Sequence, residues 1–486
     1  MSAPTSPTTH EGEQSAARPS VVAPATPLAP GRAPASPGTQ HRRSGRWIDR
    51  WDPEDPTFWR DGGRRVASRN LGISVLAEFL GFAVWALWSI VVPQLPAAGF
   101  AFTVDQQFWL IAVPSLVGAT LRIPYTFAVP LFGGRNWTVV SALLLLLPTA
   151  ALAVVVQDPG TSFGVMLAVA ALAGFGGGNF ASSMANISFF YPEREKGKAL
   201  GLNAAGGNLG TAVVQLAVPL VIVAGAGVAL ERAGLMMIPF VLLAAFLAWR
   251  FMDNLATAKA DPRSFAVATR NRHTWIISFL YIGTFGSFIG YAGAFPTLLA
   301  GQFPEATLSI AFLGALVGSV SRPLGGIVAD RLGGARVTIA SYGVMALGAV
   351  GAIRALETHS FGLFFASFLV LFVATGVGNG STYRMIPAVF QASAARALAG
   401  TTAGDPAALA AARVRARQAA AGCIGIAGAV GAFGGFLIPR GFAASTSLSG
   451  SLVPALWTFV GMYAVMAVVA WAVYLRKGSA LAAAGI

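Results

Sequence analysis

Three arginines lie inside stretches that are otherwise apolar enough to cross a membrane. Arg122 sits in "SLVGATLRIPYTFAVPLF", and Arg322 and Arg384 sit in later apolar stretches. An arginine near the centre of a bilayer costs about 2.5–3.5 kcal/mol on insertion scales, and such charges usually serve function. A guanidinium group offers five donors in a rigid planar fork, which suits a planar anion. Arg122 and Arg322 therefore predict a functional site, whereas Arg384, near a helix end, is expected to snorkel or make a local structural bond.

Arg122 and Arg322 are 200 residues apart, and their surroundings match at that spacing. "LVGATLRIPYTFAVPLFGGR" aligns with "LVGSVSRPLGGIVADRLGGAR", and "GFGGG" at 174–178 is echoed by "GVGNG" at 376–380. Two six-helix halves of the same topology, related by an axis along the membrane normal, explain this repeat. The two arginines then occupy the second helix of each half.

Other reactive side chains are scarce. Glu78 is the one acidic residue that lies inside a predicted span and away from the ends of that span, so it is a candidate for proton coupling. The single cysteine, Cys423, excludes a disulfide within the chain, and the four histidines fall near the N-terminus or near predicted helix ends. We expect no metal site and no cofactor. Because neither a nucleophile triad nor a nucleotide loop appears, we do not expect an enzyme.

Helices must hold these residues in a membrane. The 486 residues are 55% hydrophobic and 11% charged, against about 25% charged in soluble domains. Residues 139–156 form an uncharged run of transmembrane length. We predict an all-α membrane protein with twelve spans, at 71–95, 106–131, 137–156, 162–190, 199–225, 234–252, 274–299, 307–329, 336–355, 360–388, 418–440 and 452–475.

The remaining segments complete the predicted organisation. Residues 1–45 are rich in Pro, Ser, Thr, Ala and Gly, and 46–70 mix Trp with Arg at the headgroup level, so we predict a disordered basic tail at 1–70. Two halves, 71–252 and 274–475, are joined by a linker at 253–273 and followed by a short end at 476–486. Lys and Arg concentrate in alternate loops, which places both ends in the cytoplasm. The net charge of +14 then reflects topology, and no nucleic-acid partner is expected.

Two glycine-rich stretches combine small residues with amides. They are "AGFGGGNFASSMANISFFYPEREKGKALGLNAAGGNLG" at 173–210 and "TGVGNGSTYRMIP" at 375–387. Small residues let membrane helices approach closely, which is the simplest explanation of each glycine. The amides beside them need partners and commonly face a cavity in a transporter. The predicted motif positions are Gly174, Gly176, Gly178, Asn179, Gly376, Gly378 and Asn379.

These stretches, together with "RNWT" and "SRPLGGIVADRLGG", resemble the nitrate/nitrite porter family of the major facilitator superfamily, over about residues 51–475. The first half departs from the superfamily pattern, because "TFAVPLFGGR" lacks the Asp-Arg pair. The resemblance implies the major facilitator fold with twelve helices in two pseudo-symmetric halves. It also implies anion binding between Arg122 and Arg322, with Phe180 and Phe285 as flanking rings and Asn208 and Tyr281 as polar helpers. Asp330, with Arg331 and Arg336, is expected to form a cytoplasmic gate latch.

The resemblance implies a carrier of nitrate and nitrite in the cytoplasmic membrane, in contact with lipid. Two facing cations repel each other when no anion lies between them, so an empty carrier should close poorly and exchange of nitrate for nitrite is favoured. Proton–nitrate symport through Glu78 is the alternative. A membrane receptor that senses the anion without moving it is a third hypothesis.

Overall fold

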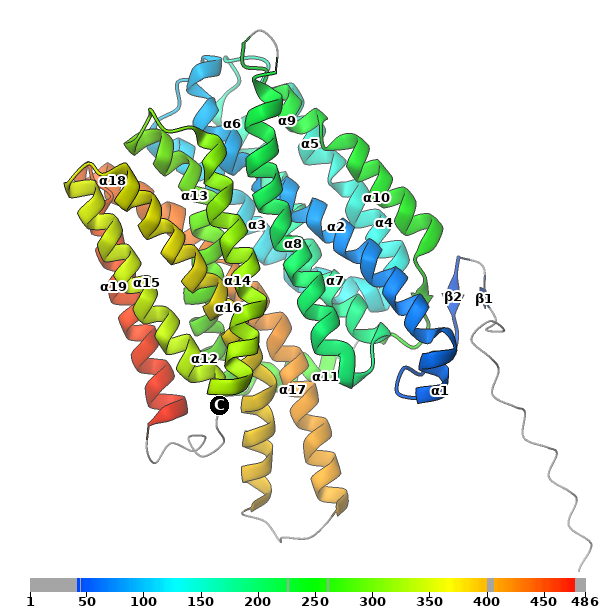
Figure 1. Cartoon of the computed structure of the whole chain (residues 1–486). Helices are drawn as coiled ribbons and strands as arrows, with labels where there is room; N and C mark the ends of the chain where they lie inside the picture. The colour runs from blue at the N-terminus through cyan, green and yellow to red at the C-terminus, as the bar shows by residue number, and fades with distance from the viewer. Residues whose placement is uncertain (1–41, 44, 225–226, 260–261, 400–405, 477–486) are drawn as a thin grey trace, which may run out of the picture.

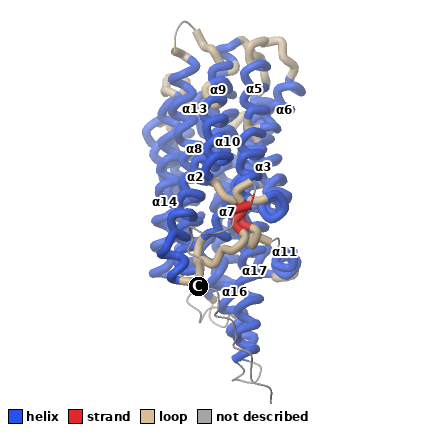
Figure 2. The backbone as a smooth tube through the Cα atoms, turned by 90° about the vertical axis from the view of Figure 1, so that its right-hand side faces the viewer, coloured by secondary structure: helices blue, strands red, loops and turns tan. Residues whose placement is uncertain are grey.

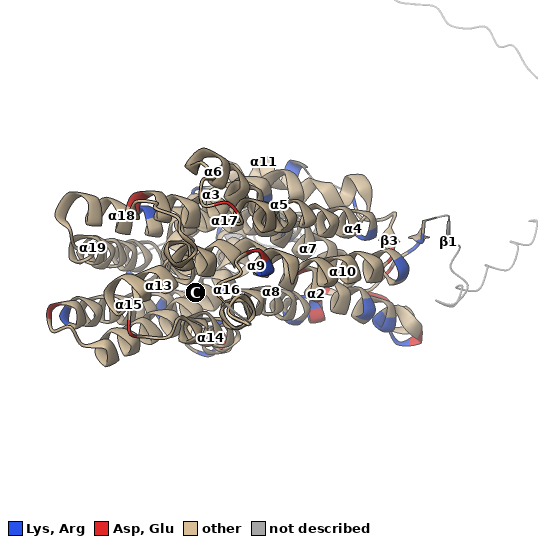
Figure 3. Ribbon diagram, turned by 90° about the horizontal axis from the view of Figure 1, so that it is seen from above, with Lys and Arg blue, Asp and Glu red and all other residues tan. Residues whose placement is uncertain are grey.

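The computed structural model describes residues 42–43, 45–224, 227–259, 262–399 and 406–476. Its helices form two groups that stand side by side, and on the ribbon seen from above most positions are uncharged (Figures 1 and 3). The end of the bundle that holds α1 and residue 476 is called the lower end here, and the opposite end the upper end (Figure 1).

The first half contains the helices before residue 252. Their bounds are α1 (Pro56–Phe58), η2 (Trp59–Gly63), α2 (Arg64–Val91), η3 (Val92–Gln94), η4 (Pro96–Ala98), α3 (Val104–Phe132), α4 (Gly134–Leu144), α5 (Leu146–Val155), α6 (Phe163–Leu172), α7 (Gly174–Phe190), α8 (Glu193–Ile222), α9 (Glu231–Leu235) and α10 (Ile238–Phe251). Short breaks inside spans, such as the one between α4 and α5, leave the helix direction continuous (Figure 1).

The second half follows a short linker helix, α11 (Pro262–Thr269). Its elements are α12 (Arg272–Tyr281), η5 (Ile282–Gly286), α13 (Ser287–Gln302), η6 (Leu308–Ala311), α14 (Phe312–Leu332), α15 (Gly334–Glu357), α16 (Phe361–Ala399), α17 (Pro406–Ala432), α18 (Gly434–Ser449), α19 (Val453–Ala470) and η7 (Trp471–Leu475).

Twelve helical segments of the described residues are long and apolar enough to cross a membrane, which confirms the predicted number. They are Pro56–Gln94, Val104–Phe132, Gly134–Val155, Phe163–Phe190, Glu193–Ile222, Glu231–Phe251, Arg272–Gln302, Leu308–Leu332, Gly334–Glu357, Phe361–Arg396, Ala411–Ser449 and Val453–Leu475. This is a multi-pass membrane protein.

The repeat is visible in the backbone itself. Gly133 and Gly333 end α3 and α14 with φ of 86° and 89°, a conformation that favours glycine. Each amide donates to the carbonyl four residues earlier, at 2.9 Å from Gly133 to Val129 and 3.0 Å from Gly333 to Ala329. The matching "GG" pairs in the sequence therefore mark the same turn in both halves.

Residues 45–59, called the N-terminal strap, are folded, contrary to the predicted disorder of 1–70. Strand β2 (Trp47–Ile48) pairs antiparallel with β1 (Arg42–Arg43) and parallel with β3 (Asn254–Leu255), beside the lower end (Figure 2). Trp51 and Trp59 are buried and donate to Phe190 O at 3.2 Å and to Glu195 Oε1 at 2.9 Å. Burial of these rings overrides the polar composition. Residues 1–41, the rest of the predicted tail, lie outside the described residues.

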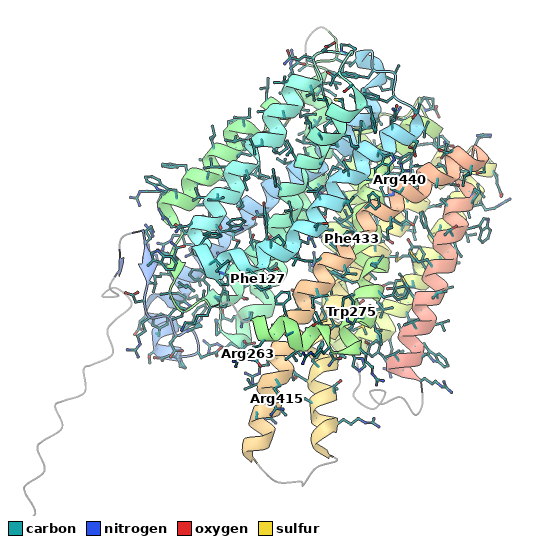
Figure 4. The ribbon with its side chains drawn as sticks, turned by 180° about the vertical axis from the view of Figure 1, so that it is seen from behind. Phe127, Arg263, Trp275, Arg415, Phe433 and Arg440 are labelled. Carbon is teal, nitrogen blue, oxygen red and sulfur yellow. The ribbon has the colours of Figure 1, made fainter. Side chains whose placement is uncertain are left out.

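The Ala- and Arg-rich stretch at 390–417 lies between the predicted spans 360–388 and 418–440 and is therefore expected to be a loop. The structure differs from this prediction. α16 continues to Ala399 and α17 begins at Pro406, so two helices project beyond the bundle as a hairpin (Figure 4). Alanine and arginine are strong helix formers. The predicted spans stop at 388 and resume at 418 because hydropathy identifies segments apolar enough for a membrane, and not helices as such.

Candidate functional site

The two repeat-related arginines meet in the middle of the molecule. Arg122 on α3 and Arg322 on α14 are 1% and 6% exposed. Both guanidinium groups lie over the same ring, because their Cζ atoms are 4.6 Å and 5.9 Å from the centroid of Phe180. The structure therefore gathers two cations from different halves around one aromatic side chain, as the sequence repeat predicts.

Hydrogen bonds orient Arg122 but leave donors unused in both arginines. Arg122 donates from Nε to Gly177 O at 3.1 Å and from Nη1 to Gly428 O at 2.7 Å. Its Nη2, and Nη1 of Arg322, are buried without a partner among the described residues. Buried donors are nearly always paired in folded proteins. Each of the two guanidinium groups therefore keeps a buried donor available to an acceptor.

Three rings line this position. Phe180 and Phe285 are stacked with centroids 6.2 Å apart, and Tyr281 stacks on Phe285 at 5.2 Å. Phe285 belongs to η5, a π-helical turn between α12 and α13, and such turns are frequent at functional sites. The Tyr342 hydroxyl donates to Leu280 O at 2.5 Å, just before that turn. The predicted pair Phe180 and Phe285 is thus brought together at Arg122, whose Cζ lies 5.0 Å from the Phe285 centroid.

Two amide side chains carry buried polar atoms without partners among the described residues. The Tyr281 hydroxyl donates to Asn379 Oδ1 at 2.8 Å, and Asn379 Nδ2 is buried without a partner. Asn208 on α8 is 1% exposed, and both polar atoms of its side chain lack partners among the described residues. Tyr281 and Asn379 are therefore one unit, and Asn208 retains its full bonding capacity.

The motif glycines bring helices into contact rather than lining the site. A Cβ at Gly176 would lie 2.0 Å from Gly81 O, so α7 and α2 cross where no side chain fits. Equivalent close contacts occur at Gly174 with Val117, at Gly178 with Leu121 and Tyr125, at Gly376 with Gly318 and at Gly378 with Thr284. Asn179 is also structural, since it donates to Ala77 O at 3.3 Å and accepts from Ser141 Oγ at 3.0 Å.

Glu78 is fully buried beside the arginines. Its Oε2 accepts from Asn203 Nδ2 at 2.7 Å and from the Ser183 hydroxyl, and its Oε1 has no partner among the described residues. Arg122 and Arg322 both act on it electrostatically. Two cations and one carboxylate therefore share the centre of the molecule, which the repeat could not predict because Glu78 has no symmetry mate there.

The predicted latch residues make a different contact. Asp330 pairs with Arg384 on α16, in the same half, and not with its neighbours Arg331 and Arg336. Both partners are about half exposed. Arg384 thus makes the local bond expected of it, and its Nη1 would be 3.9 Å from a Cβ at Gly197 on α8 of the other half.

Three residues that contact the arginines were not predicted from the sequence. Trp85 lies 5.7 Å from Arg122 Cζ, and Tyr383 lies 5.8 Å from Arg322 Cζ. Gly428 contributes a backbone carbonyl. Tyr383 belongs to the motif at 375–387, which could have suggested it, whereas Trp85 resembles any packing residue. Among the described residues, no group of three His, Cys, Asp or Glu could hold a metal ion.

Comparisons with known proteins agree with this architecture. The model of the Major Facilitator Superfamily matches residues 75–404. The chain is 41% identical over 446 residues to the nitrate/nitrite transporter NarU of Salmonella typhimurium, covering 88% of this chain and 96% of that protein. It is 36% identical over 462 residues to the probable nitrate/nitrite antiporter NarK2 of Thermus thermophilus, covering 90% and 98%.

Among solved structures, the chain is similar in fold to a D-xylose-proton symporter. The TM-score is 0.61 at 16% sequence identity, and the match covers 84% of this chain and 97% of that protein. At this identity the likeness concerns the fold alone.

Proposed function

This chain belongs to the nitrate/nitrite porter family of the major facilitator superfamily, and we propose that it moves nitrate and nitrite by alternating access, taking up nitrate in exchange for nitrite. The observation that carries the proposal is the pair of unpartnered guanidinium donors, Arg122 Nη2 and Arg322 Nη1, beside one ring. Nitrate and nitrite are planar anions with acceptors around their edges, and charge-assisted hydrogen bonds to a fork of donors are strong and directional.

The charges also explain why exchange is favoured over free uptake. Arg122 and Arg322 lie close enough to repel each other, so an empty site resists the approach of the two halves. A bound anion bonds to both arginines and removes this repulsion. The loaded carrier then changes conformation readily, and the empty one slowly. The rings of Phe180 and Phe285 exclude water from the anion, which strengthens its bonds.

Counterflow in proteoliposomes tests the proposal. Vesicles loaded with nitrite should take up external nitrate much faster than vesicles without internal anion, at equal pH on both sides. Nitrate uptake at the same rate with and without internal nitrite would contradict exchange. Internal sulfate serves as the control, because it restores ionic strength without offering a planar monovalent anion.

Proton–nitrate symport is a second candidate, supported by the position of Glu78. The hydrogen-bonding partners of this carboxylate are the neutral side chains of Ser183 and Asn203, while both arginines lie within electrostatic reach. An ionised Glu78 opposes a bound anion, and a proton on it removes that opposition. Binding of a proton and binding of nitrate would then favour each other.

Glu78→Gln distinguishes the two mechanisms because it keeps the size of the side chain and removes its charge. Symport requires that a pH gradient drive nitrate uptake without internal nitrite, and that Glu78→Gln abolish this uptake. Exchange requires that counterflow persist in Glu78→Gln. Glu305→Gln, at an exposed position before η6, is the matched control and should leave both modes intact.

We place the protein in the cytoplasmic membrane with both chain ends in the cytoplasm, on the basis of the positive-inside rule. Cys423 is completely buried, so single cysteines added at the surface report orientation. Thr57→Cys marks the strap end and Thr161→Cys the opposite end. An impermeant maleimide on intact cells should label only Thr161→Cys, and the reverse pattern would invert the orientation.

A further inference from the structure

An apolar groove lies on the outer side of the second half. It measures about 880 Å³ and runs between α14, α15 and α16. Its walls include Val328, Leu332, Val337, Val344, Val370 and Val373. From Leu332 to Val317 it follows α14 for about 22 Å, taking 1.5 Å per residue. This reaches from the lower end beyond the middle of a hydrocarbon core about 30 Å thick.

The first half fills the equivalent space with its own side chains. At the repeat spacing of 200 residues, Tyr125 and Trp137 correspond to Gly325 and Val337. The rings of Tyr125 and Trp137 meet edge to face at 4.9 Å, and Phe132 stacks on Trp137 at 5.7 Å. The second half carries a glycine, a leucine and a valine at these positions, so the groove remains where the aromatic residues are absent.

The groove opens toward lipid and carries a positive charge at its lower rim. Val328, Leu332, Val344, Val370 and Val373 are 39–56% exposed, as expected for side chains that touch hydrocarbon. Arg336, at the start of α15, is exposed and contributes to the lining. Its one recorded hydrogen bond goes to Leu332 O at 3.4 Å, and among the described residues no carboxylate pairs with it. Basic pockets between membrane helices on the cytoplasmic side bind acidic lipid headgroups.

We infer that this groove binds an acidic glycerophospholipid of the cytoplasmic leaflet, with one acyl chain between α14, α15 and α16 and the phosphate at Arg336. An acyl chain is apolar, flexible and long enough to follow the groove from headgroup level to the bilayer centre. The groove ends in contact with functional helices. Val377 on α16 lines the groove and packs against Gly325 on α14. A Cβ built on Gly325 would lie 2.2 Å from Val377 O. The lipid thus covers the crossing of the helices that carry Arg322 and Asn379.

The first half supplies the variants for a test. Val337→Trp introduces the residue of the corresponding first-half position, Trp137. Arg336→Asn likewise introduces the residue that corresponds to Arg336, which is Asn136. Arg415→Asn is the charge-matched control, because Arg415 is exposed on the projecting hairpin, away from the groove (Figure 4). Native mass spectrometry of the full-length protein, titrated separately with phosphatidylglycerol and phosphatidylcholine, gives the affinity for each lipid.

We expect wild-type protein to retain phosphatidylglycerol more strongly than phosphatidylcholine. Val337→Trp should abolish the tightest binding of both lipids. Arg336→Asn should lower the affinity for phosphatidylglycerol about fivefold and leave the affinity for phosphatidylcholine unchanged. The fivefold change corresponds to about 1 kcal/mol, the electrostatic attraction of one arginine near a membrane surface. Arg415→Asn should change neither. Thermal unfolding in detergent checks that each variant is folded, and Arg336→Asn, a surface change, keeps the test valid where Val337→Trp unfolds.

Three results would overturn the inference. Undiminished phosphatidylglycerol binding in folded Val337→Trp would show that the lipid binds elsewhere. Equal losses in Arg336→Asn and Arg415→Asn would show that the headgroup responds to overall charge only. A dimer that disappears in Val337→Trp would show that a second copy of the chain occupies the groove.

Discussion

Arg122 and Arg322 occupy equivalent positions in the two halves, and their hydrogen bonds differ. Arg122 donates to Gly177 O in its own half and to Gly428 O in the other. The guanidinium of Arg322 has no recorded hydrogen bond among the described residues, and its Nη1 is buried without a partner. One arginine is therefore fixed to the scaffold while the other keeps its donors for a ligand. A symmetric fold can thus hold an asymmetric site.

The lower ends of the halves differ in the same manner. In the first half, the fully buried carboxylate of Asp253 bonds to Arg46 of the strap at 2.9 Å, to Arg69 and to Asn70 Nδ2 at 3.2 Å. In the second half, Asp330 and Arg384 form a pair whose side chains are half exposed. The first half lacks the Asp-Arg pair of the loop motif, and the strap joins its helices instead. We therefore expect the first half, which a buried charge cluster holds together, to be the more rigid of the two at this end.

Replacing the arginines by lysine should have the largest effect. Arg322→Lys keeps the charge and loses the fork, so we expect exchange flux to fall about 10- to 100-fold, from roughly 1.5–3 kcal/mol for one charge-assisted hydrogen bond. Its Tm should stay near wild type because no scaffold bond is lost. Arg122→Lys should lose as much flux and also lower Tm, because Gly177 O and Gly428 O lose a donor. Flux in proteoliposomes and thermal unfolding measure both.

Equal Tm values for the two lysine variants would contradict the difference between a fixed and a free arginine. Wild-type flux in either variant would show that fork geometry is not the reason for arginine at that position.

The arginines were predictable because an intramembrane charge is costly and because the repeat relates the two positions. Phe180 and Phe285 were named by family resemblance, since an aromatic residue in a membrane helix has the same appearance whether it packs or binds. For the same reason Trp85 gave no signal. Gly428 could not be found either, because its contribution is a backbone carbonyl that any residue would offer.

The strap and the surroundings of Glu78 were unpredictable for a different reason. β2 has two residues and pairs with β3, about 200 positions later in the chain, as well as with β1. Local composition carries no record of such a partner. The number of spans, in contrast, follows from local hydropathy alone, and so it was predicted correctly.

Removing the carboxylates at the lower end should have the next largest effect. Asp253→Asn removes a fully buried charge that pairs with the part-buried side chains of Arg46 and Arg69, and we expect a loss of about 2–3 kcal/mol of stability. Asp330→Asn breaks an exposed pair, for which at most about 1 kcal/mol is expected. Thermal unfolding in one detergent, with both variants in parallel, measures the difference. A drop in Tm for Asp330→Asn as large as that for Asp253→Asn would reverse the assignment of the more rigid half.

The smallest effect is expected at the upper end, where one of two equivalent interfaces carries an ion pair. Arg440 on α18 bonds to Asp105 on α3 at 2.8 Å and lies 4.2 Å from the Trp109 ring centroid (Figure 4). At the repeat-related interface, Glu305 corresponds to Asp105 at the 200-residue spacing, and Leu220 follows Pro219 of α8 as Arg440 follows Pro439 of α18. Opening the upper end must therefore break a contact between α3 and α18 that has no counterpart between α14 and α8.

Arg440→Gln should shift the carrier toward an open upper end by about three- to 25-fold. An exposed ion pair contributes about 0.2–1 kcal/mol and a cation–π contact about 0.5–1 kcal/mol. Ile111→Cys reports the opening, because Ile111 is 4% exposed and its Cγ2 would lie 3.2 Å from a Cβ at Gly293 of the other half, while the native Cys423 is buried. Its labelling by a thiol reagent should accelerate in Arg440→Gln and not in the control Glu305→Gln. Equal acceleration in both would mean that the two interfaces close with equal strength, and that the asymmetry of the site does not extend to the gates.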